Sequence, residues 1–179
     1  MTGSDITAEL HAARRYALLL TRNADQAEDL VQEALAKAIA GARTWRPGAD
    51  LRRWLLAIVH NVHVSRQRRL RLELAATREA SDTLTVVTPE PQGDRVHLTE
   101  TIAALMALPA EQREPLVLVA FEGLSYRDAA EILGLPVGTL MSRLARGREA
   151  LRAATGRTRP AEPADTSPAD RRRNLRVVE

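Results

Sequence analysis

Apolar residues recur at spacings of three and four along the first part of the chain, which is the period of a helix with one buried face. The pattern predicts three helices, at roughly 6–20, 24–41 and 50–70. The apolar stripe of the second helix is formed by Ala27, Leu30, Val31, Ala34, Leu35, Ala38 and Ile39, and that of the third by Leu51, Trp54, Leu55, Ile58, Val59 and Val62. Three such stripes facing inward enclose one small core, so residues 5–75 are predicted to form a helical domain.

The periodic pattern is lost over residues 76–95, where Pro89 and Pro91 lie among Ser, Thr and acidic residues. This composition predicts a flexible linker. The helical pattern returns over residues 96–155, which predicts a second helical domain. Prolines and mixed charges predict a disordered tail over residues 156–179. The predicted fold class is therefore all-α, with two small helical domains joined by a flexible linker.

A helix-turn-helix is indicated from Ser125 onward. Ser125 is placed to cap a helix, and Asp128 three residues later completes a capping box. Gly134 suits the left-handed residue that ends this helix, and Pro136 opens the next helix where its missing N–H costs nothing. Leu140 then anchors the second helix in the core. A sharp turn followed by a core anchor is what the motif requires.

The outer face of that second helix carries hydroxyl and arginine side chains that suit a DNA major groove. Arginine forks pair with guanine edges, while hydroxyls and further arginines hold phosphates. The candidate DNA-contacting residues are Thr139, Ser142, Arg143, Arg146 and Arg148. The alternative is an ordinary helical hairpin whose arginines are solvated.

The net charge of +3 conceals a segregation of charge along the chain. Residues 43–71 contain eight arginines against Asp50 alone, and residues 143–159 contain six arginines against Glu149. Two separate basic blocks suggest two contacts with a polyanion. Solvated helix faces are the alternative, since Lys37 is the only lysine and arginine is used throughout.

The chain has no cysteine, which excludes a disulfide framework and a thiolate metal site and fits a reducing compartment. No signal peptide or membrane-length apolar run is visible, so a cytoplasmic location is expected without membrane insertion. His60 and His63 lie three residues apart with no third ligand, and a neutral structural role is favoured. No phosphate-binding loop or Ser–His–Asp pattern is present. An enzyme with a metal, cofactor or small-molecule substrate is not expected.

Segments of the second predicted domain resemble the C-terminal domain of the extracytoplasmic-function (ECF) sigma factors of the sigma-70 family. They are Leu108–Glu114, Glu122–Tyr126 and Pro136–Arg148. The resemblance implies recognition of the minus-thirty-five promoter element and contact with the polymerase flap. Met141 and Gly147 depart from the family pattern, which more often has a charged residue or Ala there.

The segment Ala27–Leu35 resembles the helix with which this family binds the largest subunit of core RNA polymerase. The residues implied in that contact are Asp29, Leu30, Gln32 and Glu33. Carboxylate and amide groups on the polar face would accept hydrogen bonds from basic side chains of a partner helix. A solvated acidic face on a surface helix is the alternative.

The segment Thr44–Asn61 resembles the family segment that reads and opens the minus-ten element, and the loop 43–50 would hold a flipped base. The implied DNA-contacting residues are Arg46, Arg52, Arg53, Asn61, Ser65, Arg66, Arg68 and Arg69. Trp54 is interpreted as a core residue because it lies on the apolar stripe. Trp45 is either an anchor of the loop or a stacking ring, and the anchor is favoured.

The resemblance thus implies a non-enzymatic alternative sigma factor with core RNA polymerase and promoter DNA as partners, and an anti-sigma factor as a further expected partner. Two alternatives belong to other classes. A stand-alone helix-turn-helix regulator would bind DNA without polymerase. A sigma-like decoy would bind a regulator and no DNA, and it should lack the arginines of both basic blocks.

Overall fold

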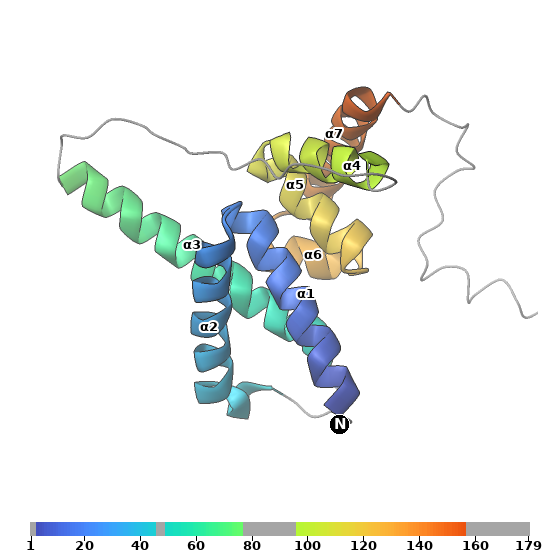
Figure 1. Cartoon of the computed structure of the whole chain (residues 1–179). Helices are drawn as coiled ribbons and strands as arrows, with labels where there is room; N and C mark the ends of the chain where they lie inside the picture. The colour runs from blue at the N-terminus through green and yellow to red at the C-terminus, as the bar shows by residue number, and fades with distance from the viewer. Residues whose placement is uncertain (1–2, 46–48, 77–95, 157–179) are drawn as a thin grey trace, which may run out of the picture.

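The computed structural model describes residues 3–45, 49–76 and 96–156, which contain helices and no strands (Figure 1). The all-α prediction is confirmed. The predicted linker and tail lie outside the described residues apart from residues 76 and 156. The α-helices are α1 (Gly3–Thr21), α2 (Ala24–Ala40), α3 (Leu51–Ala76), α4 (Val96–Ala107), α5 (Ala110–Leu116), α6 (Tyr126–Ile132) and α7 (Val137–Thr155).

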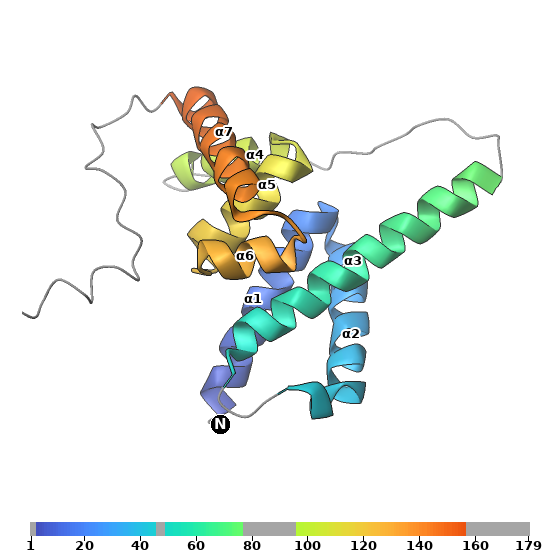
Figure 2. The same cartoon turned by 180° about the vertical axis from the view of Figure 1, so that it is seen from behind.

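The helices α1, α2 and α3 pack against one another and form the N-terminal group. Asn23 caps α2, because its side-chain oxygen accepts a hydrogen bond from the Gln26 N–H at 3.0 Å. The end of α3 runs beyond the body of the molecule in both views (Figures 1 and 2). The core face of α3 differs from the predicted one: Leu56 and His60 are buried, whereas Trp54 is only partly buried. Ile39, which was predicted to be apolar core, is 78% exposed.

The helices α4 to α7 form the C-terminal group, and the predicted helix-turn-helix is present in it. The Ser125 side chain accepts a hydrogen bond from the Asp128 N–H at 3.1 Å, and Gly134 has a φ of +63°. Both observations confirm the predicted cap and turn, and the Asp128 carboxylate accepts a hydrogen bond from the Ser125 hydroxyl. Pro136 directly precedes α7, as predicted, and α7 is 19 residues long.

A π-helical turn at Val117–Phe121 continues α5 directly. Pro115 lies inside α5 and has no N–H to donate to the preceding turn, so the carbonyl of Glu111 loses its usual helical partner. The Glu122 N–H donates to the Val117 carbonyl at 3.0 Å, which closes the wide turn. As a result Phe121 is half exposed, while the next residue, Glu122, is buried.

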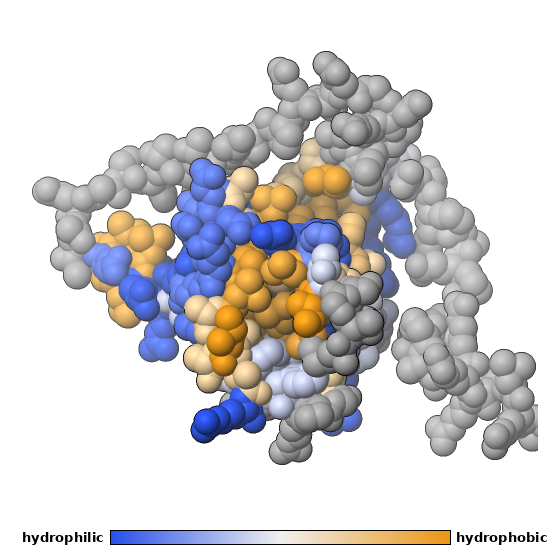
Figure 3. Space-filling view, turned by 60° about the horizontal axis from the view of Figure 1, so that its bottom comes forward, coloured by the Kyte–Doolittle hydropathy of each residue, from blue (hydrophilic) through white to orange (hydrophobic). Residues whose placement is uncertain are grey.

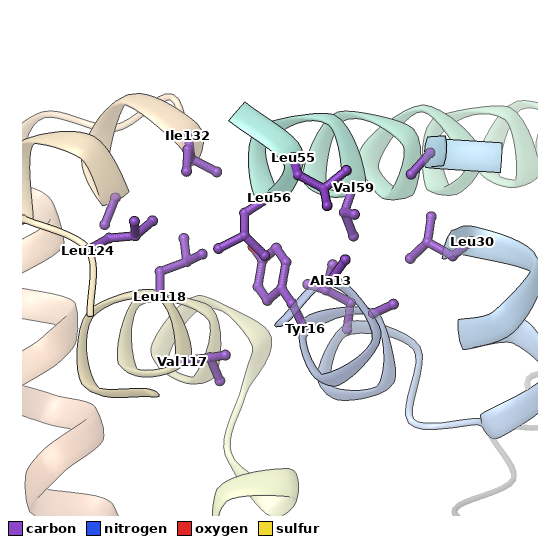
Figure 4. Close-up of a cluster of buried hydrophobic side chains, with 14 of the residues drawn as sticks. Ala13, Tyr16, Leu30, Leu55, Leu56, Val59, Val117, Leu118, Leu124 and Ile132 are labelled. Carbon is purple, nitrogen blue, oxygen red and sulfur yellow. The ribbon is translucent and has the colours of Figure 1, made fainter. Parts of the chain in front are cut away.

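The two helical groups share one continuous hydrophobic cluster. In Figure 4, Leu56 of α3 and Tyr16 of α1 lie beside Leu118 of the π-helical turn. Contacts between the groups run from α3 to α6 and from α1 to α5 and the π-helical turn. The helices group as the predicted domain boundaries suggest, but their cores meet; that each group is an independent domain stays a prediction.

Gly147 is buried where α7 crosses α5. A Cβ at this position would lie 2.8 Å from Leu116 Cδ1 and 3.0 Å from the Gln112 carbonyl oxygen. The Gln112 oxygen belongs to the backbone of α5, so it cannot shift without distorting that helix. Gly147 therefore serves the close approach of two helices, which explains its departure from the family pattern better than a contact with a base.

We expect Gly147→Ala to lower the free energy of unfolding by about 1 kcal/mol, because overpacking of roughly 1–3 kcal/mol exceeds the gain of up to about 1 kcal/mol in helix propensity. Gly138→Ala, in the same helix, is the control, since nothing lies within 4 Å of its Cβ position. Urea denaturation followed by circular dichroism measures both. Equal or greater stability of Gly147→Ala would contradict the packing role.

A buried polar pair lies at the junction of the two groups. Tyr16 Oη and His60 Nδ1 share a hydrogen bond at 3.1 Å, and Glu114 Oε2 lies 3.9 Å from the same nitrogen. Burial lowers the pKa of His60 to about 4, with a smaller contribution from His63, and burial raises the pKa of Glu114. His60 is therefore neutral near pH 7, as the favoured structural interpretation requires.

Because the folded-state pKa of His60 lies below its ordinary value of about 6.5, the unfolded chain binds more protons between those values. Stability should fall as the pH is lowered from about 6.5 towards 4. The loss attributable to His60 should approach but not exceed about 1.4 kcal/mol per pH unit. Denaturation curves of the wild type and His60→Gln at several pH values should show a shallower dependence in the variant. Parallel curves would contradict the assignment.

Candidate nucleic-acid interface

The outer face of α7 brings together four of the five predicted residues. Thr139, Ser142, Arg143 and Arg146 lie on neighbouring positions of one side, because they are separated by nearly whole helical turns. Arg148 follows Thr139 by about two and a half turns and therefore points to the opposite side. The helix does not place Arg148 with the others.

Local hydrogen bonds orient this α7 face. Ser142 Oγ donates to the Thr139 carbonyl at 2.9 Å, and Arg146 Nε donates to the Ser142 carbonyl at 3.4 Å. Arg146 and Ser142 are exposed, while Arg143 lies 3.9 Å from Glu111 of α5. The guanidinium of Arg146 keeps its terminal nitrogens available for a base edge or a phosphate.

The open face of α3 carries Asn61, Ser65, Arg68 and Arg69, all of which are exposed. Ser65 Oγ donates to the Asn61 carbonyl at 2.7 Å, which holds the hydroxyl against the helix. These four residues are separated by nearly whole turns of α3, a long and straight helix (Figure 2), so they share one side of it. Such an arrangement fits a nucleic-acid backbone with base edges beside it.

Arg52 and Arg66 lie on the inward side of α3 and are engaged within the N-terminal group. Arg52 Nε is 2.7 Å from Glu9 Oε2, and Arg66 Nε is 2.7 Å from Glu33 Oε2. Arg66 also donates to the Asp29 carbonyl at 2.9 Å. Both arginines form ion pairs within the chain, and their expected contact with DNA phosphates stays a prediction. Arg46 lies outside the described residues.

Arg53 is engaged by the C-terminal group. Its Nε lies 2.9 Å from Asp128 Oδ1, and its terminal nitrogen lies 2.6 Å from Glu131 Oε2. Both carboxylates belong to α6, the first helix of the helix-turn-helix. A side chain predicted to hold promoter DNA therefore forms ion pairs across the junction between the two groups.

A pocket of about 400 Å³ lies at the start of α3. The residues that line it are Trp45, Ala49, Asp50, Arg53, Trp54, Ala57, Asn61, Glu131 and Ile132. Its volume lies within the range of small-molecule pockets. Trp45 Nε1 is buried and has no hydrogen-bond partner among the described residues.

The interpretation of Trp54 as a core residue holds only in part, whereas the interpretation of Trp45 as an anchor of the loop stays a prediction. Trp54 lines the pocket and packs only partly against the core, because the inward face of α3 is centred on Leu56 and Val59. Trp45 is half-buried at the same pocket. Two indole rings spaced nine residues apart on either side of a loop were the signal for this pocket in the sequence.

The acidic face of α2 is partly open. Asp29 and Gln32 are exposed, while Glu33 is bound by Lys37 at 3.0 Å and by Arg66. The hydrogen bond from Arg66 is the main cause that lowers the pKa of Glu33. Leu30 is fully buried. As a core residue it supports α2 from within, and the expectation that it contacts polymerase directly is corrected.

In the described part of the chain, no three His, Cys, Asp or Glu residues come together in a way that would hold a metal ion. No helix among the described residues is long and apolar enough to cross a membrane. Some large hydrophobic side chains are nevertheless exposed, and Figure 3 shows hydrophobic areas on either side of a hydrophilic band on one face.

Family models match both helical groups. Residues 98–151 match sigma-70, region 4, and residues 6–60 match the Sigma2 domain of PhyR. The ECF RNA polymerase sigma factor EcfG of Rhodopseudomonas palustris is 41% identical over 151 residues, which cover 83% of this chain and 82% of that protein. The chain belongs to the ECF RNA polymerase sigma factors.

A second relative of this sigma factor is the probable RNA polymerase sigma-C factor of Mycobacterium bovis. It is 38% identical over 130 residues, which cover 70% of this chain and 68% of that protein. Among solved structures, the sigma factor RpoE of Bartonella quintana in complex with the anti-sigma factor NepR is similar, with a TM-score of 0.73 and 34% identity. The match covers 87% of this chain and 97% of that one.

The Bartonella match also concerns the arrangement of the two groups. The N-terminal group, residues 3–76, makes up less than half of the 179 residues. A TM-score of 0.73 therefore requires both groups to superpose together. The sigma factor described here and the Bartonella protein share not only their helices but also the way in which the two helical groups are packed.

Proposed function

We propose that this sigma factor binds core RNA polymerase through the acidic face of α2 and directs it to promoters through α3 and α7. The main support for this proposal is that each of the two helical groups has an exposed face with arginine side chains. The face with Asn61, Ser65 and Arg68 would read the minus-ten element, and the face with Thr139, Ser142 and Arg146 the minus-thirty-five element. The place of action would be the cytoplasm.

The pocket beside α3 supports a role in strand opening. A base leaving the duplex loses its stacking, at a cost of a few kcal/mol. The indole rings of Trp45 and Trp54 offer a surface for stacking, which returns on the order of 1–3 kcal/mol per base. Opening would thus be driven by binding, without an enzymatic step and without a cofactor.

An anti-sigma factor is proposed as a further partner. The Bartonella relative is described in complex with the anti-sigma factor NepR, and its two helical groups are packed as in this chain. A decoy without DNA binding is disfavoured because both arginine-bearing faces are retained. A regulator that acts without polymerase is disfavoured because a family model also matches the N-terminal group.

We expect Asp29→Ala combined with Gln32→Ala to weaken binding to purified core RNA polymerase about tenfold or more, because two polar acceptors are lost from the proposed interface. Run-off transcription from a genomic library should fall in parallel. Glu28→Ala is the control, since Glu28 lies on the same helix, is exposed and pairs only with the exposed Arg14 at 3.4 Å. Wild-type protein that joins polymerase but initiates nowhere would refute the proposed function.

We expect Arg146→Ala to reduce discrimination between a cognate minus-thirty-five element and a mutated one by about 5- to 100-fold, since a bidentate contact is worth roughly 1–3 kcal/mol. Arg146→Lys should keep the attraction to phosphate but lose most of the discrimination, because lysine lacks the planar fork. Promoter-strength ratios in run-off assays measure both variants. Unaltered ratios in Arg146→Ala would remove this residue from base recognition.

A further inference from the structure

The exposed side of α7 extends beyond the side that holds the predicted DNA-contacting residues. Leu140, Leu144 and Gly147 are buried, and the residues on the opposite side of the helix are open to solvent. Within residues 137–147 the exposed positions are Val137, Gly138, Met141, Ser142, Ala145 and Arg146. Arg146 lies at one edge of this open face, and Val137 and Met141 lie at the other.

Val137, Met141 and Ala145 form an exposed apolar strip along the second edge. They follow one another at intervals of four residues, so each lies about one turn beyond the last on the same side of the helix. Val137 is 42% exposed and Met141 is 43% exposed. Single exposed apolar side chains are common on protein surfaces, but these three are aligned. The second helix of the helix-turn-helix thus presents an apolar strip beside its polar residues.

The DNA major groove offers one apolar group that suits such a strip, the C5 methyl group of thymine. In a helix-turn-helix the N-terminal residues of the second helix contact the base edges. Val137 and Met141 lie in the first two turns of α7, which is the part expected to enter the groove. The strip therefore lies where a thymine methyl group would be met.

The side chains around Met141 favour a close approach of a base pair. Gly138 and Ala145 lie next to it on the open face, and no atom lies within 4 Å of the position that a Cβ of Gly138 would take. The middle of the face is therefore low, and a base edge can come near the backbone of α7. Methionine is unbranched and polarizable, so it can adapt its shape to a methyl group beside it.

We propose that Met141 is a specificity-determining residue that recognises the methyl group of a thymine in the minus-thirty-five element, with Val137 and Ala145 extending the apolar contact. The inference deepens the proposed function and rests on it, since it requires α7 to lie in the major groove. Met141 carries no charge, so it adds no attraction to phosphates. It distinguishes base pairs by the presence of a methyl group, while Arg146 and Ser142 provide polar contacts on the other part of the face.

A protein partner fits the strip less well than DNA does. A stable protein interface buries about 800 Å² on each partner, and three side chains in a single row supply only a small part of that area. The strip also lies on the same open face as the guanidinium of Arg146, which suits a polyanion. The neighbouring charge and the small apolar area both favour a nucleic acid.

The experiment uses the holoenzyme formed from the full chain and core RNA polymerase. Run-off transcription from a genomic library first identifies the minus-thirty-five element. Duplex promoters are then prepared in which each thymine of that element is replaced in turn by deoxyuridine, which removes only the C5 methyl group. We expect one position, or two adjacent positions, at which the substitution weakens binding of the wild-type holoenzyme about threefold to fivefold, as burial of one methyl group predicts.

Variants of Met141 test whether this side chain makes the contact. Met141→Ala should bind the thymine promoter about threefold or more weakly and should no longer distinguish thymine from deoxyuridine at the sensitive position. Met141→Leu should retain most of the discrimination, because it keeps an apolar side chain of similar size. The matched control is Ile102→Ala on α4, which removes an apolar side chain of similar exposure, 42%, from the same helical group. It should leave the affinity and the methyl dependence unchanged.

Three results would overturn the inference: a minus-thirty-five element without any A·T pair, no position that depends on the methyl group, or equal methyl dependence in Met141→Ala and the wild type. Weaker binding of Met141→Ala to core polymerase without DNA would assign the strip to a protein contact and would overturn it as well. A holoenzyme that initiates nowhere refutes the proposed function. A holoenzyme that initiates at defined promoters without methyl dependence refutes only the role of Met141.

Discussion

A buried carboxylate organises the junction on which the arrangement of this molecule depends. Glu122 follows the π-helical turn, and its side chain points into the region where α1 and α3 meet the C-terminal group. A buried charge is tolerated only with a partner, and Arg15 supplies it. Around this pair, Leu56, Tyr16 and Leu118 join two helical groups into one hydrophobic cluster (Figure 4).

The packing of the helices determines which arginine side chains of α3 are held in ion pairs and which are exposed. Arginines that seem equivalent in a basic segment fall into two classes. Arg52, Arg53 and Arg66 are bound by carboxylates, whereas Arg68 and Arg69 are exposed on the far part of the helix. A carboxylate of the chain and a phosphate use the same guanidinium donors, so an arginine held in an ion pair is less available to a phosphate than an exposed one.

On the acidic helix α2, an ion pair links the surface proposed for polymerase to a residue expected at the DNA. Glu33 lies on the surface proposed for polymerase and also binds Arg66, a residue expected at the DNA. Asp29 and Gln32 are exposed and carry the proposed contact, while Leu30 supports them from the core. A side chain next to a binding surface is therefore not by itself a binding residue; its partners within the fold decide whether it is available.

The sequence by itself determined the helices, the capping by Ser125, the turn at Gly134 and the polar face of α7 with Thr139, Ser142 and Arg146, because these follow from local periodicity and local hydrogen bonds. It also carried the family resemblance that the comparisons confirmed. Only the tertiary structure decided that Leu56 and His60 join the buried face of α3, that Arg15 meets Glu122 and that Arg53 meets α6. These contacts join residues far apart in the chain, and helical periodicity contains no information about which distant face a side chain will meet.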